Sequence, residues 1–429
     1  MYLTGWTALL AALGAVPAAA LESRAAAWLW VLGTLALAGL DAWMAPSVRS
    51  LGVRREPPES VRLGESAAST LVAANLGRRT LRGAVRDAWP PSVGATQARH
   101  PVALGPGESV RLRTALRPTR RGDLTAGAVT VRLAGPLRLA GRQRSFAVPA
   151  RVRVLPEFAS RRHLPARLAR LRELDGRSSV LLKGAGSEFD SMREYVPGDD
   201  VRTIDWRSTA RRGDVIVRTY RPERDRRIVV VVDTSRLSAT RVADAPRLDA
   251  SIEAALLLSA LAAHAGDRVQ ATAWDRVERA RAAAPGTRIV HQLADAVAAV
   301  EPSLLEPDWP GLVRLLQGRV SQRSLVVLLT TVDTGAADSG LIDAVGALAA
   351  RHLVLVASVE DPELASLERG RADADAHYEA GAAARASLER EAVAGMLRRL
   401  GAEVVLAGPD ELAPAVADRY LALKTAGRL

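Results

Sequence analysis

Two apolar segments at the start of the chain constrain the fold most strongly. Residues 3–21 and 25–44 contain a single charged side chain, Asp41, and only the tripeptide ESR separates the longest uncharged runs. Each segment is close to the ~20 residues that cross a bilayer as a helix. So short a connection leaves room only for an antiparallel pair. The sequence therefore predicts a transmembrane helical hairpin within residues 1–48.

Basic residues around these segments predict the orientation. Arg49, Arg54 and Arg55 follow the second segment, whereas Arg24 alone lies between the two. Because cytoplasmic flanks carry the excess of arginine and lysine, both ends of the hairpin are expected to face the cytoplasm. The alternative is a cleaved signal peptide, since VPAAA resembles a cleavage site. No Lys or Arg precedes the first segment, however, as a signal peptide would require.

The composition excludes several kinds of chemistry. The chain has no cysteine, which removes disulfides, thiolate metal sites and cysteine nucleophiles. Its only lysines are Lys183 and Lys424, so no Gly-Lys-Ser/Thr phosphate loop is present. The net charge is +12, but the arginines are scattered among acids and aromatic residues are few. This pattern argues against a nucleic-acid interface.

The rest of the chain divides into three regions. Residues 50–155 alternate apolar and polar side chains between Gly and Pro turns, which predicts a small all-β module of the immunoglobulin-like sandwich type. Residues 156–227 are densely charged and begin with an amphipathic helix. Residues 228–429 alternate buried strands with helices, which predicts an α/β domain with a doubly wound parallel sheet. Ligands of such sheets bind beyond the carboxyl ends of the strands.

Within the charged region, acids and arginines alternate at close spacing around aromatic and glycine residues. Carboxylates and guanidinium groups so close together can pair through two parallel hydrogen bonds. The residues concerned are Glu188, Arg193, Glu194, Tyr195, Gly198, Asp199, Asp200, Arg202, Asp205 and Trp206. Three interpretations remain open: a neutralised network that attaches this segment to the next domain, a docking surface for a partner, or acid–base chemistry by Asp199, Asp200 and Asp205.

The stretch GSEFDSMREYVPGDDVRTIDWRSTARRGDVIVRTYRPERDRRIVVVVDTS resembles the signature of a bacterial family, the domain of unknown function 58. The upstream RPTRRGDLTAGAVTVRLAGPLRLAGRQR is also similar, although Gly135-Pro136 stands where Asp-Pro is usual. The resemblance implies a protein anchored in the bacterial inner membrane, with a von Willebrand factor A-like domain. It also implies a partner, a MoxR-type AAA+ ATPase, and other membrane proteins nearby.

A von Willebrand factor A-like domain would hold a metal ion through Asp-x-Ser-x-Ser and two further loops. Asp233 and Ser235 match this pattern, but Leu237 stands at the second serine. In the third loop Thr331 stands at the aspartate position, and Asp333 follows two residues later. Because Mg²⁺ requires six oxygen ligands, these residues predict a degenerate site with at most weak Mg²⁺ binding. Asp233 is instead expected to accept hydrogen bonds from loop amides.

These observations favour a non-enzymatic, membrane-anchored interaction protein without a firmly bound cofactor or a small-molecule substrate. Two alternatives stay open. One is a metal-dependent binding protein that uses the degenerate site, and the other is a hydrolase that uses Asp199, Asp200 and Asp205. Geometry separates the hypotheses, since a hydrolase needs these carboxylates to converge, whereas an adaptor needs them paired with arginines.

Overall fold

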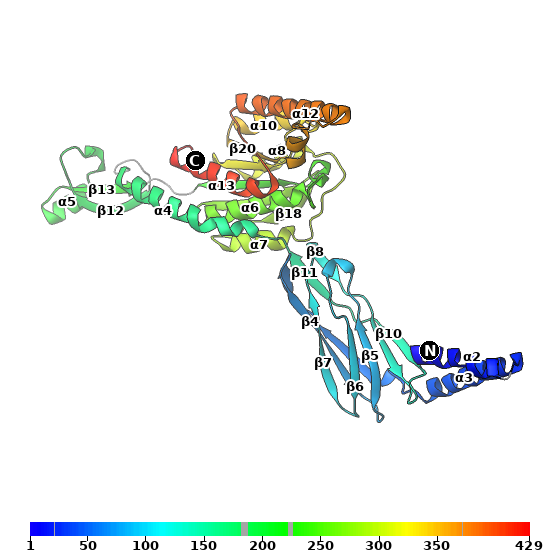
Figure 1. The fold of residues 1–429 in the computed structure, drawn as a ribbon. Coiled ribbons are helices and arrows are strands. Elements are labelled where there is room, and N and C mark those ends of the chain that lie inside the picture. The colour runs from blue at the N-terminus through cyan, green and yellow to red at the C-terminus, as the bar shows by residue number, and fades with distance from the viewer. Residues whose placement is uncertain (21, 182–187, 222–225, 371) are drawn as a thin grey trace. The chain divides into compact units, whose positions relative to one another are not determined.

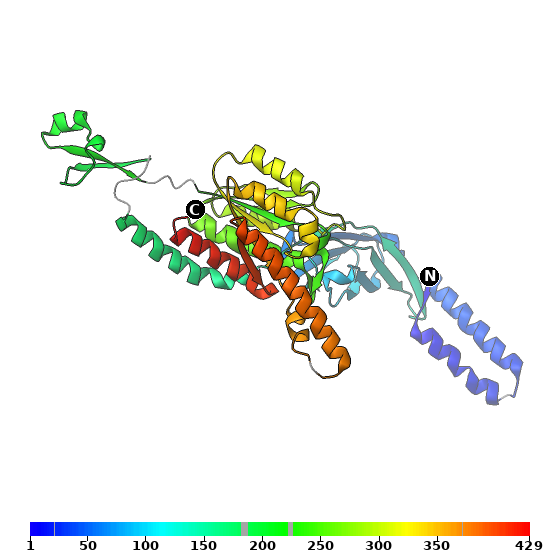
Figure 2. The same ribbon diagram turned by 90° about the horizontal axis from the view of Figure 1, so that it is seen from above.

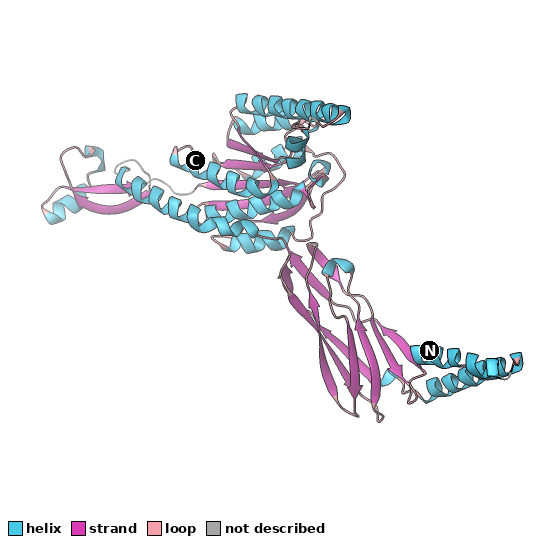
Figure 3. Ribbon diagram, in the orientation of Figure 1, coloured by secondary structure: helices cyan, strands magenta, loops and turns pink. Residues whose placement is uncertain are grey.

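The structure is a computed structural model that describes residues 1–20, 22–181, 188–221, 226–370 and 372–429 (Figure 1). It divides into two compact units, residues 1–155 and residues 156–429, and each is described by itself. Helices and strands are mixed along the chain, with an all-β region in the first unit (Figure 3). The coarser part of the fold prediction, a mixed α/β protein with an all-β region and an apolar helix near the N-terminus, is therefore confirmed.

The first unit opens with the short strand β1 (Tyr2–Leu3) and three apolar helices. These helices are α1 (Gly5–Leu13), α2 (Ala15–Ala20) and α3 (Arg24–Met44). Helices α1 and α2 lie beside α3 (Figure 2), and the Trp30 indole donates a hydrogen bond to the Leu10 carbonyl at 2.8 Å. Among the described residues, one helical segment, Arg24–Ser50, is long and apolar enough to cross a membrane.

The other apolar segment differs from the single helix expected over residues 3–21. It is divided after Leu13, and Pro17 explains the division. Proline has no amide hydrogen to donate to the carbonyl four residues earlier, and its ring collides with that carbonyl. The residue four positions before Pro17 is Leu13, where α1 ends. The helix therefore ends and restarts within the apolar segment.

Asp41, the charged residue inside the second apolar segment, is fully buried. Its carboxylate accepts hydrogen bonds from the backbone amides of Leu137 at 2.7 Å, Leu139 at 2.8 Å and Ala140 at 2.9 Å. Leu137 and Leu139 lie in the turn before strand β10 (Ala140–Phe146), and Ala140 is the first residue of that strand. A Cβ atom at Gly135 would overlap the Asp41 carboxylate, so this position requires glycine. Gly135 thus accommodates the contact between α3 and the turn.

The all-β region forms three sheets with the orders β1-β10-β9-β5-β6, β3-β11-β8 and β2-β4-β7. Its strands are β2 (Leu51–Glu56), β3 (Ser60–Arg62), β4 (Ala67–Asn75), β5 (Leu81–Asp87), β6 (Arg99–Leu104), β7 (Ser109–Leu116), β8 (Gly122–Thr125), β9 (Val129–Ala134), β10 (Ala140–Phe146) and β11 (Arg151–Leu155). Short 3₁₀ helices lie at η1 (Val48–Ser50) and η2 (Pro91–Val93). Side chains in β4 and β7 alternate between buried and exposed, as the period of two predicts.

A buried ion pair lies within this all-β region. The Arg55 Nε donates to the Asp87 carboxylate at 3.0 Å, and both side chains are fully buried. The Trp89 indole donates to the other Asp87 oxygen at 3.1 Å and lies under the guanidinium of Arg55. Arg55 also donates to the Gly127 carbonyl at 3.2 Å. The pair is therefore fully hydrogen-bonded, which is the condition under which buried charges are tolerated.

The second unit begins with η3 (Ala159–His163) and α4 (Leu164–Leu181). The amphipathic helix predicted here is present, because Leu164, Leu168 and Leu171 pack against the apolar core of this unit. Arg167 donates a hydrogen bond to Asp418 at 2.6 Å, which joins α4 to the last helix.

A six-stranded sheet forms the centre of this unit, in the order β18-β17-β14-β19-β20-β21. Its strands are β14 (Arg227–Asp233), β17 (Arg268–Trp274), β18 (Glu278–Ala282), β19 (Leu325–Leu329), β20 (Leu353–Val359) and β21 (Glu403–Ala407). All neighbouring strands are parallel except β17 and β18. Strand β14 is buried along nearly its whole length, as its run of valines predicts.

Helices cover both faces of the sheet. They are α6 (Arg247–His264), α7 (Arg288–Val297), α8 (Trp309–Arg319), α9 (Thr334–Asp338), α10 (Leu341–Ala349), α11 (Pro362–Leu367), α12 (Ala374–Arg399) and α13 (Pro409–Thr425). Between β14 and α6 lie η5 (Arg236–Ala239), β15 (Arg241–Val242) and β16 (Ala245–Pro246). Val230 and Val232 pack with α6, α7 and α13, whereas Val229 and Val231 pack with α8, α10 and α12. Asp373 caps the first turn of α12 by accepting from the Ala376 amide at 2.8 Å.

Candidate functional site

The charged signature folds into a small β-hairpin with two helical turns. Its elements are β12 (Glu188–Glu194), η4 (Val201–Thr203), α5 (Trp206–Arg212) and β13 (Ile216–Arg221), and β12 pairs antiparallel with β13. The Tyr195 amide continues this pairing by donating to the Val215 carbonyl at 2.8 Å. The backbone of Glu188 lies at the start of β12, and its side chain is outside the part of the chain that the structure describes.

Asp199 is held by an arginine of β12. Arg193 donates to its two carboxylate oxygens at 2.7 and 2.6 Å, and the Val196 amide donates to one of them at 2.9 Å. This is the bidentate geometry that the alternating charges predict. Gly198 lies in the turn between them with φ of 110°, a conformation that side chains disfavour. Arg193, Gly198 and Asp199 therefore form one hydrogen-bonded turn.

Asp205 performs a similar structural role at the start of α5. Its carboxylate accepts from the Ser208 amide at 2.8 Å and from the Arg218 Nε at 2.6 Å. These hydrogen bonds, from the Ser208 amide first and from Arg218 second, lower the pKa of Asp205. Asp200 accepts from the Arg202 amide at 2.9 Å and so caps η4. Each of the three carboxylates proposed for hydrolysis thus has its own protein donor.

Apolar side chains of the same segment point outward instead. Trp206 has 68 % of its surface exposed. Four more large apolar residues of the hairpin are exposed with it, namely Met192, Val196, Val201 and Val215. We call these five residues the exposed apolar set of the hairpin. Sequence reasoning included Trp206 but missed the other four, because single apolar residues in a charged segment give no periodic signal.

The second candidate cluster lies at the carboxyl end of β14. Asp233 is buried, and its two carboxylate oxygens accept from the Ser235 amide at 2.8 Å and from the Thr330 hydroxyl at 2.6 Å. Burial raises the pKa of Asp233, although both hydrogen bonds oppose the rise. The hydrogen bond from a loop amide is the one that the sequence predicted. Thr330 was missed as a partner, although it follows β19, the neighbour of β14.

Asp275, which follows β17, was also missed. Its side chain is buried and accepts from the Val277 amide at 3.1 Å and from the Arg279 Nε at 2.7 Å. Burial raises the pKa of Asp275, but the donors outweigh burial and the net shift is downward. The negative charge of Asp275 contributes to the raised pKa of Asp233. The signal available in the sequence was a carboxylate directly after a buried strand.

The remaining predicted metal ligands have structural partners. Asp333 caps α9 by accepting from the Ala336 amide at 2.8 Å, and the Ser235 hydroxyl accepts from the Leu237 amide at 3.4 Å. In the described parts of the chain, no three His, Cys, Asp or Glu side chains are grouped closely enough to hold a metal ion. Leu237, at the second serine position of the metal-binding pattern, supplies no side-chain oxygen.

Comparison with known proteins supports the resemblance found in the sequence. Residues 191–392 match the family described as "Protein of unknown function DUF58", which confirms the resemblance for this part of the chain. An uncharacterized protein of Mycobacterium tuberculosis, Rv1480, is 29 % identical over 192 residues, as is the uncharacterized protein Mb1516 of Mycobacterium bovis. The matched region covers 44 % of this chain and 60 % of each relative. The chain thus spans about three fifths of the length of these relatives.

Similar solved structures include the CARDB domain of PF1109 from Pyrococcus furiosus, at 20 % identity over 24 % of this chain and 94 % of that domain, with a TM-score of 0.19. Another is an exo β-N-acetylglucosaminidase from Vibrio harveyi, at 11 % identity over 83 % of this chain and 75 % of the enzyme, with a TM-score of 0.22. Both TM-scores are too low to support an argument about fold or function.

Proposed function

We propose that this chain is a membrane-anchored protein-interaction protein without enzymatic activity. Its second unit would be a von Willebrand factor A-like domain, and the hairpin before it would be the docking surface. The order of the central sheet supports the first part, because its first strand lies in the middle and the edge strand β18 alone is antiparallel. Large sheets of this kind present their loops at the carboxyl edge.

Membrane anchoring is supported by α3 and its surroundings. Its 21 residues extend about 31 Å, close to the thickness of the hydrocarbon layer. Only 22 % of the most apolar window of this segment is buried, whereas the core helix of a soluble protein is mostly buried. The excess of arginine after α3 favours an orientation with both units in the cytoplasm of a bacterial cell.

The observation that carries the docking proposal is that the polar and the apolar side chains of the hairpin have different surroundings. Its carboxylates Asp199, Asp200 and Asp205 are engaged by donors of the hairpin itself, while the exposed apolar set faces outward. Exposed apolar side chains mark a protein-binding surface where they form one patch, and aromatic residues and methionine are enriched in such patches. The family resemblance suggests a MoxR-type AAA+ ATPase as the partner, acting as a chaperone-like remodeller.

Co-purification with a matched pair of variants tests this proposal. Burying the exposed part of a tryptophan removes roughly 100–170 Å² from water, or about 3–4 kcal/mol before other costs. Trp206→Ala should therefore lower the affinity at least 30-fold, the ~2 kcal/mol typical of a central interface residue. The control is Tyr378→Ala, which removes an exposed aromatic side chain of α12 outside the hairpin.

The full chain would be captured in mild detergent from cells that express a MoxR-type ATPase, and bound ATPase quantified by mass spectrometry. We expect recovery with the unmodified chain and with Tyr378→Ala, and its loss with Trp206→Ala. Failure to recover the ATPase would count against this partner. Equal recovery with both variants would contradict the docking surface, and a lower melting temperature of Trp206→Ala would mean that the tryptophan packs inside the protein.

A further inference from the structure

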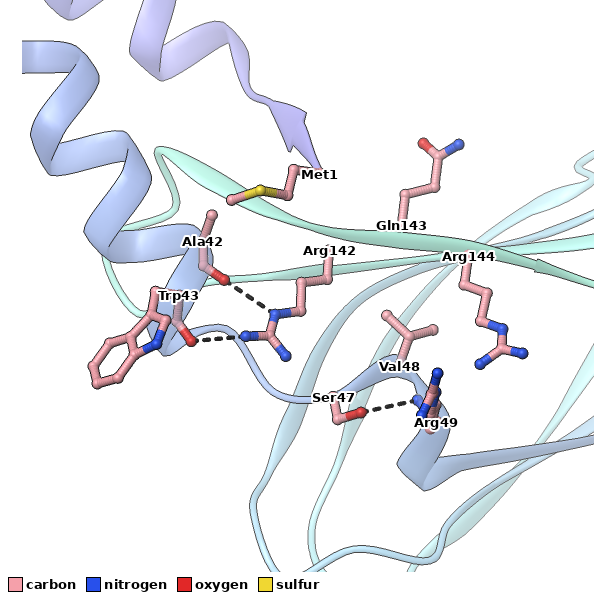
Figure 4. Close-up of a pocket in the computed structure, with 9 residues that line it drawn as sticks. All are labelled: Met1, Ala42, Trp43, Ser47, Val48, Arg49, Arg142, Gln143 and Arg144. Carbon is pink, nitrogen blue, oxygen red and sulfur yellow. Dashed lines mark hydrogen bonds between the residues drawn. The ribbon is translucent and has the colours of Figure 1, made fainter.

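A basic cavity lies at the end of α3 in the first unit. It has a volume of about 740 Å³ and is bordered by the last turn of α3, by η1 and by β10 (Figure 4). Arg49, Arg142 and Arg144 line it, and none of the nine lining residues is acidic. Neither Arg49 nor Arg144 forms an ion pair within the described residues, and both are exposed. The cavity therefore presents uncompensated positive charge.

Arg142 joins this cavity to the helix. Its guanidinium donates to the Ala42 carbonyl at 3.2 Å and to the Trp43 carbonyl at 3.0 Å (Figure 4). Carbonyl groups in the last turn of a helix have no partner within the helix, so an arginine here also complements the negative end of the helix dipole. Arg142 is thus held in position by the backbone. The Arg144 guanidinium lies over the Phe146 ring at 5.4 Å, and neither it nor Arg49 has an acidic partner in the described parts of the chain, so both can contact an anion.

The level of the cavity along α3 indicates what the ligand is. Trp43, in the last turn, has 73 % of its surface exposed, and indoles are enriched where the hydrocarbon layer meets the headgroups. In a bilayer crossed by α3, Trp43 would lie at the edge of the hydrocarbon layer. Arg49 and Arg144, which line the same cavity, would then lie at the level of the lipid phosphates. The exposed side chains of Met1 and Trp43 would border the same cavity on its apolar side.

We propose that this cavity binds the phosphate group of an anionic phospholipid such as phosphatidylglycerol. Arg49 and Arg144 contact the phosphate, Arg142 adds positive charge, and Trp43 packs against the glycerol backbone and upper acyl chains. The inference rests on the membrane anchoring proposed above. A soluble phosphate has the same charge, but the apolar border favours the lipid. Clusters of arginines beside a membrane helix have the charge that anionic headgroups require.

The test uses the full chain in phosphatidylcholine nanodiscs that contain a minor fraction of brominated lipid, either phosphatidylglycerol or phosphatidylcholine. Bromine quenches nearby indoles, and subtracting the signal of a Trp43→Phe variant isolates Trp43. The site variant is Arg49→Gln/Arg144→Gln. The control is Arg82→Gln/Arg86→Gln, which removes two exposed arginines of β5 outside the cavity.

We expect stronger quenching of Trp43 by brominated phosphatidylglycerol than by brominated phosphatidylcholine at low ionic strength. Each arginine near an anionic surface changes affinity about fivefold, so the site variant should lower this preference about 25-fold and the control should keep it. Equal quenching by the two lipids overturns the lipid site but leaves the anchoring intact. Absence of quenching by either lipid contradicts the anchoring itself. Loss of the preference on addition of inorganic phosphate reassigns the cavity to a soluble anion and overturns the proposal.

Discussion

Replacing Asp41 by alanine should release the turn before β10 from α3. In the folded chain the Asp41 carboxylate is the acceptor for the backbone amides of Leu137, Leu139 and Ala140. Alanine has no acceptor atom, so these three amides lose their hydrogen-bond partner. The Asp41 carboxylate that it replaces is completely buried. The loss should be local, because β10, which follows the turn, keeps its own pairing with β9 and with β1.

The magnitude follows from the burial of each donor. The hydrogen bond to the Ala140 amide is buried, and an unsatisfied buried amide costs about 2 kcal/mol. The hydrogen bonds to Leu137 and Leu139 are partly buried, so water can replace the carboxylate and each costs about 1 kcal/mol. The sum of about 4 kcal/mol corresponds to roughly a thousandfold increase in local opening. Asp41→Asn retains one acceptor oxygen and should give an intermediate increase.

Amide hydrogen exchange of the full chain in nanodiscs measures this opening directly. Exchange at Leu139 and Ala140 should accelerate about a thousandfold in Asp41→Ala. The control is Thr34→Ala on the same helix, which removes a 2.9 Å hydrogen bond to the Trp30 carbonyl and no contact with the turn. Unchanged exchange at Ala140 in Asp41→Ala would refute the reasoning, as would an equal acceleration in Thr34→Ala.

Two further predictions concern ion pairs, one in each unit. Asp87→Ala should destabilise the all-β region by about 3–5 kcal/mol in urea denaturation, since it leaves Arg55 buried without its counter-charge; Arg55→Met/Asp87→Leu should recover most of this loss, and equal losses would exclude the unpaired charge as the cause. In the second unit, hydrogen bonds from Arg319 at 2.6 and 3.0 Å lower the pKa of Glu278 below its ordinary 4.5. Their stabilisation is therefore present above pH 4.5 and is lost as the pH falls through the lowered pKa. The melting temperature of Glu278→Gln should fall less steeply in this acid range than that of the unmodified chain, and identical slopes would contradict the assignment.

The sequence predicted the kinds of interaction in the candidate site, but it did not predict which residues pair with which. The alternation of acids and arginines predicts mutual pairing, yet only the turn at Gly198 selects Arg193 for Asp199, six residues away. Likewise, the buried run of valines predicts a strand, and Asp233 stands at its carboxyl end. The partner of Asp233 is Thr330, 97 residues further along, because β19 lies next to β14 in the sheet. Local patterns carry no information about which strands become neighbours.

The amino-acid sequence by itself determined that the N-terminal helices are apolar and that the strands of the all-β region alternate buried and exposed side chains. It also determined the alternation of strands and helices in the second unit. These features depend on side-chain spacing within about ten residues, which the backbone period converts into a buried face. Only the tertiary structure decided that Asp41 binds the turn at 137–140, that Gly135 must lack a side chain, and that Arg49, Arg142 and Arg144 border one cavity. Those contacts join residues about a hundred positions apart, so they exist only once the sheets have assembled and brought distant backbone groups within hydrogen-bonding distance.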